Sequence, residues 1–366
     1  MAKRTLSLVV PCYNEEKTLA RCIERVMRLQ SDTLHLEIII VDDCSQDRSL
    51  ETALALAKAH PQISVLQHDR NQGKGAALRT GFLHATGDFV GIQDADDEYN
   101  PLEYITLLAP LLDGRADVVF GSRYLRPDTR RVLYFWHTQM NRVLTFCSNM
   151  FTDLGITDME TCYKLFKREI IQDIAPKLRE NRFGFEPEVT ALVAEKKCRV
   201  YECAISYNPR TYEEGKKIGW KDGLRALYCI FHYGAHRAPM PMQVAIYLFI
   251  GIVAALVNIG CFTGLLSAGF SMGAAIAAAF ILAAAVNYLL CITILFQHKA
   301  YWSTAGELIA YTGTVAVMGL LDYAVTTGLL TLGLLPFWAK AWATVVGFAG
   351  NFIFRRWLVF REKTRD

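Results

Sequence analysis

Four acidic residues lie within five positions of one another, directly after a short apolar run. They belong to the segment Asp94-Ala95-Asp96-Asp97-Glu98. Clustered carboxylates at the end of a buried strand are unfavourable unless a cation neutralises them. Hard divalent cations prefer carboxylate oxygens and share them with phosphate groups. Asp94 and Asp96 point to the same side of an extended segment, and Glu98 can add a third carboxylate. The segment predicts a metal site for a phosphorylated ligand, with a solvated acidic turn as the alternative.

The residues before this cluster alternate between aliphatic runs and helical patterns. The predicted strands are Leu6–Val10, Glu37–Val41, Ile63–Gln67 and Phe89–Gln93, and the predicted helices lie after Asn14, at Ser49–Ala59 and near Gly75–Ala85. Asn14 is the predicted N-cap of the first helix, because its side chain can accept a backbone N–H. Such alternation builds βαβ units with a mostly parallel sheet. The carboxyl ends of the strands then meet at one edge, and the polar residues that follow three of them predict a shared site.

The residues from about 243 to 358 are almost continuously apolar, which contrasts with the first part of the chain. Four segments are long enough to cross a bilayer, which needs ~20 apolar residues. They are Val244–Leu266, Gly273–Phe296, Leu308–Leu330 and Phe337–Phe354. Their glycine and alanine content suits close helix packing in lipid. We predict an all-α domain with four transmembrane helices; a large buried helical core is the alternative.

Basic residues gather on alternate connections of these segments, because the turn Ser267–Met272 has no charge and the connection before the fourth segment has only Lys340. They are His236 and Arg237 before the first, His298 and Lys299 between the second and third, and Arg355, Arg356, Arg361, Lys363 and Arg365 after the fourth. The positive-inside tendency therefore predicts an integral membrane protein with both termini and the α/β domain in the cytoplasm. Lys3 and Arg4 lead directly into a strand pattern, so we expect no cleaved signal peptide. The ten cysteines form no Cys-x-x-Cys pair, which favours reduced thiols.

Four ordered motifs carry a family resemblance. They are Val-Pro-Cys-Tyr-Asn-Glu at 10–15, Val-Asp-Asp-Cys-Ser-Gln-Asp at 41–47, Asn-Gln-Gly-Lys-Gly-Ala-Ala-Leu-Arg-Thr-Gly at 71–81 and Asp-Ala-Asp at 94–96. Together they resemble family-2 glycosyltransferases with the Rossmann-like GT-A fold. The segments 121–124, 157–164 and 183–186 resemble the polyprenyl-phosphate sugar synthases of the dolichyl-phosphate mannose synthase type. The apolar part resembles GtrA-like membrane domains. The resemblance implies a catalytic domain over 1–235 and a four-helix transmembrane domain over 236–366.

The resemblance implies a donor site at the sheet edge. Its residues are Pro11, Tyr13 and Glu15 for the nucleoside, Asp43 for the base edge, Lys74 for a phosphate, and Asp94, Asp96 and Glu98 for Mg²⁺ or Mn²⁺. Some members of the resembled family have Gln where this chain has Glu98. Two of these have simpler explanations. Tyr13 can be a packing residue, and Lys74 between two glycines can belong to a surface turn.

The resemblance also implies an acceptor site for a lipid phosphate. Arg123 matches a residue that grips this phosphate, although it can instead pair with a core acid. Arg131 has the same implied role, but its neighbour Arg130 fits as well. Arg210 with Lys216 or Lys217 matches a loop over the donor diphosphate, or else a membrane-facing basic patch. The residues that we expect to act in catalysis are Asp96, Arg123, Arg131, Arg210 and Lys217.

Two further segments mix large apolar side chains with basic ones, at 131–151 and 220–233. Both are typical of helices that lie in the lipid headgroup layer. Core-facing helices are the alternative.

The implied reaction is transfer of a hexose to a polyprenyl phosphate by one displacement with inversion. The acceptor oxygen is already anionic, so the reaction needs no strong general base. We expect GDP-mannose as donor, with UDP-glucose as the alternative. A lipid-linked sugar flippase or transport component is the alternative from another class. The expected partners are these two substrates and the bilayer, with no nucleic acid; a homo-oligomer stays open.

Overall fold

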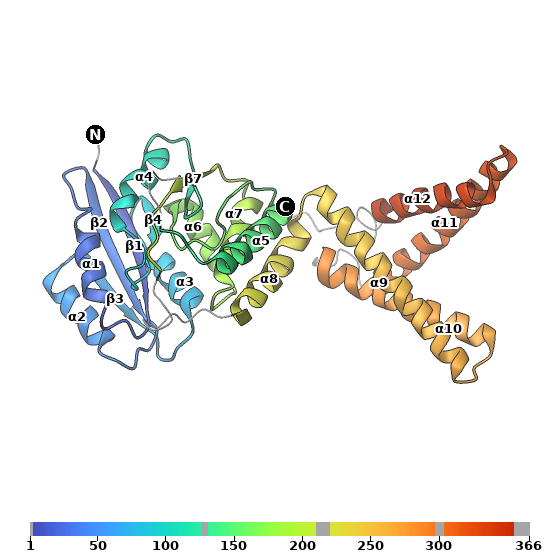
Figure 1. Ribbon diagram of the computed structural model, residues 1–366, viewed down its shortest axis with the longest axis horizontal. Coiled ribbons are helices and arrows are strands. Elements are labelled where there is room, and N and C mark those ends of the chain that lie inside the picture. The colour runs from blue at the N-terminus through green and yellow to red at the C-terminus, as the bar shows by residue number, and fades with distance from the viewer. Residues whose placement is uncertain (1–2, 126–130, 210–219, 297–303, 355–366) are drawn as a thin grey trace. The chain divides into compact units, whose positions relative to one another are not determined.

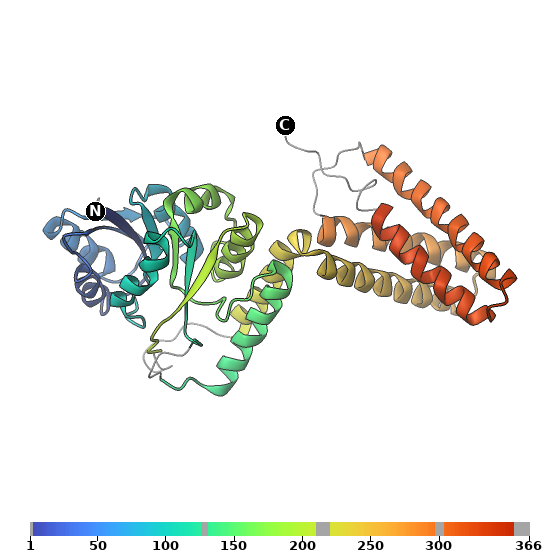
Figure 2. The ribbon, with the colours of Figure 1, turned by 90° about the horizontal axis from the view of Figure 1, so that it is seen from above.

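The structure is a computed structural model that describes residues 3–125, 131–209, 220–296 and 304–354. The chain divides into two compact units, Met1–Pro239 and Met240–Asp366, and each is described by itself (Figures 1 and 2).

The first unit is built on a seven-stranded sheet in the order β3-β2-β1-β4-β6-β5-β7. The strands are β1 (Arg4–Cys12), β2 (Leu34–Asp42), β3 (Ile63–Gln67), β4 (Phe89–Ile92), β5 (Val118–Ser122), β6 (Lys164–Lys167) and β7 (Val200–Ala204). Only β6 runs against its neighbours, and the other described pairings are parallel. The prediction of an α/β domain with a mostly parallel sheet is therefore confirmed, and all four predicted strands are present.

Helices connect the strands and cover the sheet (Figure 1). They are α1 (Leu19–Met27), α2 (Ser49–Ala59), α3 (Lys74–His84), α4 (Tyr104–Leu112), α5 (Phe135–Thr152), α6 (Arg168–Ile174), α7 (Phe185–Glu195) and α8 (Trp220–Gly234), with short 3-10 turns at Pro101–Glu103, Ala175–Lys177 and Ala235–Arg237. The core is aliphatic because β1 and β2 are covered on both faces, and Leu8, Val9 and Ile38 are fully buried.

The predicted start of the first helix is wrong. Helix α1 begins at Leu19, with Thr18 and not Asn14 at its N-cap position. Asn14 has a positive φ of 55°, a conformation that asparagine tolerates better than most residues. Its Oδ1 accepts a hydrogen bond from the N–H of Gln46 (2.8 Å), and its own N–H donates to Ser45 Oγ (3.1 Å). Asn14 therefore joins the loops after β1 and β2.

The second unit contains the four predicted helices. They are α9 (Met240–Ser267), α10 (Met272–Leu290) with a π-helical extension (Cys291–Phe296), α11 (Thr304–Thr331) and α12 (Pro336–Phe354). Helix α9 packs along α10, and α11 along α12. Among the residues that the structure describes, α9 is the one helix that is long and apolar enough to cross a membrane, with a mean hydropathy of 2.4. The number of spans stays a prediction.

Candidate active site

The carboxyl ends of β1, β2, β4 and β5 meet at one edge of the sheet. Strands β1, β2 and β4 are parallel to one another, and β5 has the same direction because β6 is antiparallel to both β4 and β5. The polar segments after these strands begin at Tyr13, Asp43, Gln93 and Arg123. The structure thus brings the predicted donor residues and one predicted acceptor residue to the same edge.

Asp43 organises the loop before α3. Its Oδ1 accepts from the N–H of Gln72 (2.8 Å) and contacts His68 Nδ1 (2.7 Å), while Oδ2 accepts from the N–H of Gly73 (2.6 Å). A carboxylate oxygen has two lone pairs, so Oδ2 keeps one for a further donor. This geometry is compatible with the predicted contact to a base edge.

The residues predicted to hold the nucleoside lie next to Asp43, because the end of β1 and the end of β2 are neighbours in the sheet. Pro11 is within β1, and Tyr13 and Glu15 are half-buried in the loop that follows. Glu15 is fixed by two contacts: its N–H donates to Ser49 Oγ (2.7 Å), and Thr18 Oγ1 donates to Glu15 Oε2 (2.8 Å). The contact to Ser49 joins the loop to the first turn of α2, and the contact to Thr18 joins it to the start of α1.

Lys74 bridges two acids. Its Nζ lies 3.1 Å from Asp94 Oδ1 and 3.2 Å from Glu186 Oε1. Burial disfavours the ammonium, yet Asp94 and other negative groups, Glu186 among them, raise the pKa of Lys74 well above its ordinary value. The side chain is 19% exposed, so the surface-turn alternative is wrong. Lys74 supplies a cation for Asp94 that the local sequence around Asp94 does not contain.

The four acids after β4 have different partners. Asp97 pairs with Arg25 and with Arg21 (2.6 Å), and Glu98 Oε2 accepts from the Tyr207 hydroxyl (2.7 Å). Asp96 Oδ1 accepts from the N–H of Glu98 (3.1 Å). In the described ranges, no group of three His, Cys, Asp or Glu side chains is placed to hold a metal ion.

Asp94 and Asp96 as ligands of Mg²⁺ or Mn²⁺ stay a prediction. Mg²⁺ commonly takes one or two carboxylates and completes its shell with substrate phosphates and water. The two hard oxygen donors therefore fit a cation that arrives with a diphosphate. Glu98 as a third ligand stays a prediction.

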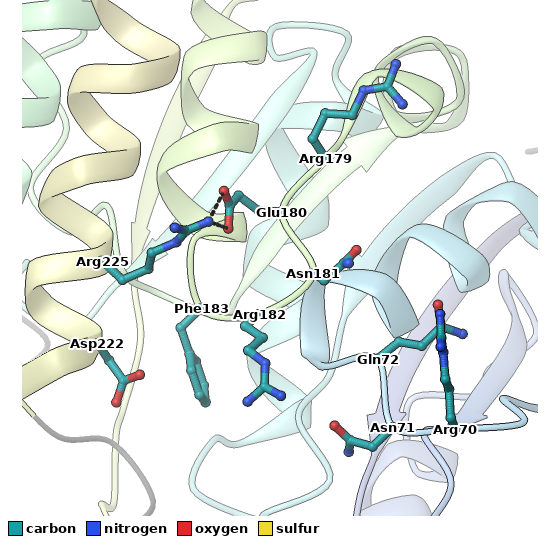
Figure 3. Close-up of a pocket in the computed structure, with 10 residues that line it drawn as sticks. All are labelled: Arg70, Asn71, Gln72, Arg179, Glu180, Asn181, Arg182, Phe183, Asp222 and Arg225. Atoms are coloured by element: carbon teal, nitrogen blue, oxygen red, sulfur yellow. Dashed lines mark hydrogen bonds and ion pairs between the residues drawn. The ribbon is translucent and has the colours of Figure 1, made fainter.

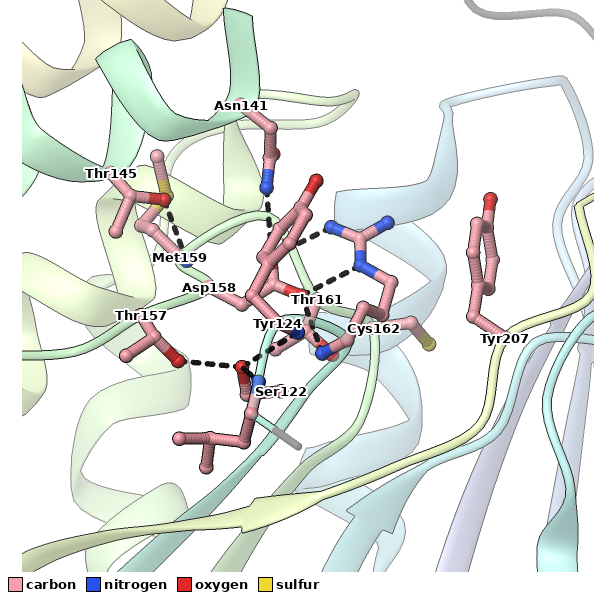
Figure 4. A network of polar contacts seen from close by, with 12 residues as sticks. Ser122, Tyr124, Asn141, Thr145, Thr157, Asp158, Met159, Thr161, Cys162 and Tyr207 are labelled. Carbon is pink, nitrogen blue, oxygen red and sulfur yellow. Dashed lines mark hydrogen bonds and ion pairs between the residues drawn. The ribbon is translucent and has the colours of Figure 1, made fainter. Parts of the chain in front are cut away.

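Arg123, at the end of β5, forms a two-point ion pair with Asp158. Nε lies 2.7 Å from Oδ2 and Nη2 lies 2.7 Å from Oδ1. Asp158 is fully buried and also accepts from the N–H of Arg123 (3.0 Å) and from Asn141 Nδ2 (3.0 Å), as Figure 4 shows around Asp158. Burial would lower the pKa of Arg123, but Asp158 raises it well above its ordinary value. The core-acid alternative is thus confirmed, and it leaves an acceptor role open.

Tyr207 connects the acidic segment to Arg123. Its hydroxyl donates to Glu98, and its ring centre lies 5.0 Å from the Arg123 guanidinium carbon. The ring is within cation–π range. Burial and then Glu98 raise the pKa of the Tyr207 hydroxyl, so it is a donor at neutral pH.

Of the other predicted basic residues, Arg131 is the one that the structure describes. Arg131 is exposed just before α5, and its Nη1 donates to the carbonyl of Pro209 (3.3 Å). Arg130, Arg210, Lys216 and Lys217 lie outside the described residues.

A buried cluster of charges lies beneath the site. Lys164 donates from Nζ to the carbonyls of Met159 (2.9 Å) and Thr161. Burial lowers the pKa of Lys164, and burial together with the nearby Glu186 raises the pKa of Glu160 to about 8. Glu160 Oε1, Thr161 Oγ1 and Glu186 Oε2 are shielded from solvent, and no described residue gives them a hydrogen bond.

The loop 179–183 packs against the glycines that flank Lys74. A Cβ at Gly75 would lie 2.4 Å from the carbonyl oxygen of Glu180, and one at Gly73 would lie 2.4 Å from that of Asn181. Only glycine permits this approach. The Glu180 carboxylate in turn accepts from Arg225 Nη2 (2.8 and 3.0 Å) and from the Tyr233 hydroxyl (3.0 Å), both on α8.

This loop also lines a pocket of about 490 Å³ (Figure 3). The lining residues are Arg70, Asn71, Gln72, Arg179, Glu180, Asn181, Arg182, Phe183, Asp222 and Arg225. Four arginines face two acids here, and Arg225 is already paired with Glu180. The pocket is therefore basic.

Sequence reasoning assigned no role to Tyr207 and Glu186. Glu186 belongs to the motif at 183–186, but the sequence does not show that it pairs with Lys74. Tyr207 had no local signal, because its contact to Glu98 spans 109 positions.

Comparison with known proteins gives two family matches. Residues 7–175 match the family described as glycosyl transferase family 2, and residues 246–360 match the family described as GtrA/DPMS, transmembrane domain. The second match indicates a membrane protein.

Similar curated proteins carry consistent names. A dolichyl-phosphate beta-glucosyltransferase of Drosophila melanogaster is 30% identical over 246 residues, which cover 62% of this chain and 74% of that protein. Dolichyl-phosphate beta-glucosyltransferase ALG5A of Trichomonas vaginalis (strain ATCC PRA-98 / G3) is 31% identical over 218 residues, which cover 56% of this chain and 65% of that protein. The chain therefore spans slightly less than two thirds of the Trichomonas relative. Among solved structures, glucosyl-3-phosphoglycerate synthase of M. tuberculosis has a TM-score of 0.49 at 17% identity, and the match covers 63% of this chain and 81% of that chain.

Proposed function

We propose that this chain, which belongs to the family-2 glycosyltransferases, transfers a hexose from a nucleotide sugar to a polyprenyl phosphate. The observation that carries the proposal is the placement of Asp94 and Arg123 after β4 and β5, at one edge of one sheet. An acid that suits a metal–diphosphate and an arginine that suits a phosphate then serve two anionic substrates.

The reaction needs two anions brought together and one bond exchanged. An oxygen of the acceptor phosphate forms a bond to the anomeric carbon. The bond from that carbon to the donor phosphate oxygen breaks, and its electron pair leaves on the nucleoside diphosphate. No proton is transferred, because the acceptor oxygen is already anionic. Attack opposite the leaving group inverts the anomeric centre.

The residues of the chain contribute charge and position. Lys74 holds its ammonium 3.1 Å from Asp94, so a donor phosphate bound beside Asp94 would meet a positive charge there. Arg123 keeps Nη1 available, because its described hydrogen bonds to Asp158 use Nε and Nη2. A divalent cation held by Asp94 and Asp96 would neutralise the leaving diphosphate.

Glucose is the hexose that the relatives favour. The sequence led us to expect mannose from GDP-mannose, but the similar curated proteins are named as glucosyltransferases. We therefore propose UDP-glucose as the donor, with GDP-mannose as the competing candidate.

The proposal includes a membrane-bound acceptor reached from the cytoplasmic side. Helices α5 and α8 expose large apolar side chains, and Trp136 is 79% exposed. The other exposed ones include Phe135, Met140, Val143, Phe146, Leu224, Tyr228 and Phe231. An apolar face of this kind suits the headgroup layer, where the acceptor phosphate lies.

The test uses the full-length protein purified in detergent, with polyprenyl phosphate, Mg²⁺ or Mn²⁺, and UDP-glucose or GDP-mannose labelled in the sugar. We expect label in the lipid fraction from UDP-glucose. Label from GDP-mannose alone would restore the mannose prediction. If neither donor nor a wider panel of nucleotide hexoses labels the lipid, the proposed function is wrong.

A further inference from the structure

The position of Glu186 singles it out among the buried acids. Through Lys74 it is connected to Asp94, the first acid of the metal motif (3.2 and 3.1 Å). Its charge also acts on Glu160 and Lys164, in the segment 158–164 whose Asp158 holds Arg123. Glu186 is therefore joined to the predicted donor phosphate site by an ion pair and belongs to the same network of charges as the predicted acceptor arginine.

The hexose ring must lie next to the donor phosphate site, because its anomeric carbon stays bonded to the donor phosphate until the acceptor attacks. Its hydroxyls are donors that require acceptors, and a carboxylate is the strongest acceptor that a protein offers. Glu186 Oε1 contacts Lys74, but Oε2 is shielded from solvent and receives no hydrogen bond from any residue in the described ranges. A buried carboxylate oxygen without a partner is costly.

Accordingly, we infer that Glu186 binds a hydroxyl of the transferred hexose and so selects the sugar. The inference rests on the proposed function and extends it from a substrate class to a residue. A donor diphosphate beside Asp94 gives the Lys74 ammonium a competing anion. Movement of that ammonium uncovers the Glu186 carboxylate, and a sugar hydroxyl replaces the lost hydrogen bond.

Glu188 provides a matched control on the same helix. It is also buried, but its two oxygens accept from the N–H groups of Arg179 (2.8 Å) and Glu180 (2.8 Å). Each oxygen of its carboxylate already accepts a backbone N–H of the loop. Glu188→Gln therefore tests the effect of losing a buried charge in this turn without losing a sugar contact.

The experiment is a double-mutant cycle on the full-length protein. The donors are UDP-glucose and its four monodeoxy analogues, and the proteins are wild type, Glu186→Gln, Glu186→Asp and Glu188→Gln. We expect Glu186→Gln to lower kcat/KM for UDP-glucose by about ten- to a hundredfold, the loss typical of a charge-assisted hydrogen bond. The deoxy analogue that lacks the contacted hydroxyl should have a kcat/KM lower by a similar factor with wild type. With Glu186→Gln, kcat/KM for this analogue should be almost the same as for UDP-glucose. Glu188→Gln should lower all five donors by one common factor.

A binding measurement separates this inference from the proposed function. Calorimetry with Mg²⁺ gives the affinity of UDP-glucose relative to UDP, and this ratio reports the sugar without any turnover. We expect Glu186→Gln to bind UDP-glucose less tightly relative to UDP than wild type does. Glu188→Gln should keep the relative affinity of wild type. The inference is wrong if the loss caused by Glu186→Gln and the loss caused by removing a hydroxyl are independent for every deoxy analogue. It is also wrong if Glu186→Gln weakens the binding of UDP and of UDP-glucose by the same factor. If Glu186→Gln does not fold, Glu186→Asp gives the same comparison. If Glu186→Gln lowers the relative affinity for UDP-glucose but wild type transfers no sugar to lipid, the proposed function is wrong and the inference on Glu186 stands.

Discussion

Arg123 and Asp158 are held by two hydrogen bonds of 2.7 Å, and both side chains lie inside the protein. The pair fixes the plane of the guanidinium and leaves Nη1 as the end that can receive a phosphate. Arg123 is therefore both a structural residue and a candidate acceptor residue. The two roles predict different experimental outcomes.

Arg123→Lys tests the acceptor role. Lysine keeps the charge but cannot hold Asp158 at two points while it donates to a phosphate. We expect the acceptor KM to rise about ten- to a hundredfold, from the loss of ~1.5–3 kcal/mol. Calorimetry should give an unchanged affinity for UDP. A variant that lost UDP affinity and kept its response to the acceptor would place Arg123 in the donor site.

Arg123→Met tests the structural role. Removing one partner leaves Asp158 as a buried unpaired charge, which destabilises by about 3–5 kcal/mol. We expect a lower thermal unfolding midpoint in detergent, and partial recovery in the double variant Arg123→Met/Asp158→Asn, because the amide carries no charge. Equal midpoints for wild type and the single variant would show that the pair contributes little to the fold.

Asp96→Asn and Asp97→Asn separate two neighbouring acids. Asp97 pairs with Arg21 and Arg25, whereas Asp96 is the candidate metal ligand. We expect Asp96→Asn to abolish most transfer and to raise the Mg²⁺ concentration needed for half-maximal rate. Asp97→Asn should lower the unfolding midpoint slightly and leave the Mg²⁺ dependence unchanged. The same shift in both variants would contradict the assignment.

Gly75→Ala tests the close packing beside Lys74. The new Cβ would meet the carbonyl oxygen of Glu180 at 2.4 Å, and backbone cannot move away easily. We expect a loss of about 1–3 kcal/mol in stability, as in other overpacked sites, together with weaker UDP-glucose binding. Gly155→Ala is the control, because its Cβ would have nothing within 4 Å. Native stability in Gly75→Ala would contradict the packing argument.

Glu160 predicts a pH dependence of stability. Burial and then Glu186 raise its pKa from 4.5 to about 8 in the folded protein. The protonated carboxyl therefore stabilises the fold fully below the unfolded value, and this contribution is lost as the pH rises through about 8. The slope is at most ~1.4 kcal/mol per pH unit.

Glu160→Gln is neutral at every pH, so its unfolding midpoint should fall less than that of wild type between about pH 5 and 8, where only the unfolded wild type loses this proton. Glu195→Gln removes a largely exposed carboxylate on α7 that pairs with Arg237 (2.8 Å), so it should shift the midpoint without changing the pH trend of wild type. Parallel curves for all three proteins would show that Glu160 does not titrate in this range.

The sheet was predictable because its strands are short aliphatic runs between turns. Ile63–Gln67 and Ser49–Ala59 have the bounds that the hydrophobic pattern indicated. Asn14 was misassigned because its side chain joins two loops, and a local cap pattern cannot reveal a partner 32 positions away.

The candidate site was predictable as a set of residue types but not as a set of pairs. The sequence contains Arg123, Lys74 and several buried acids, yet it does not say which opposite charges meet. Asp158 is 35 positions from Arg123. Lys74, at the start of α3, pairs with Glu186 on α7, which is even more distant in the sequence. Such pairs are set by the packing of β5, β6, α3 and α7, which a single sequence does not specify.

The contact between Glu180 and Arg225 has a mechanical consequence. Glu180 touches Gly75 through its carbonyl and α8 through its carboxylate, so one residue joins the donor loop to a helix with an exposed apolar face. A small shift of α8 would be transmitted through a backbone contact that has no spare space. Donor affinity would then vary with the lipid or detergent around α8, even though no lipid touches the nucleotide. Binding of the protein to the bilayer through α8 would thereby change its affinity for the donor.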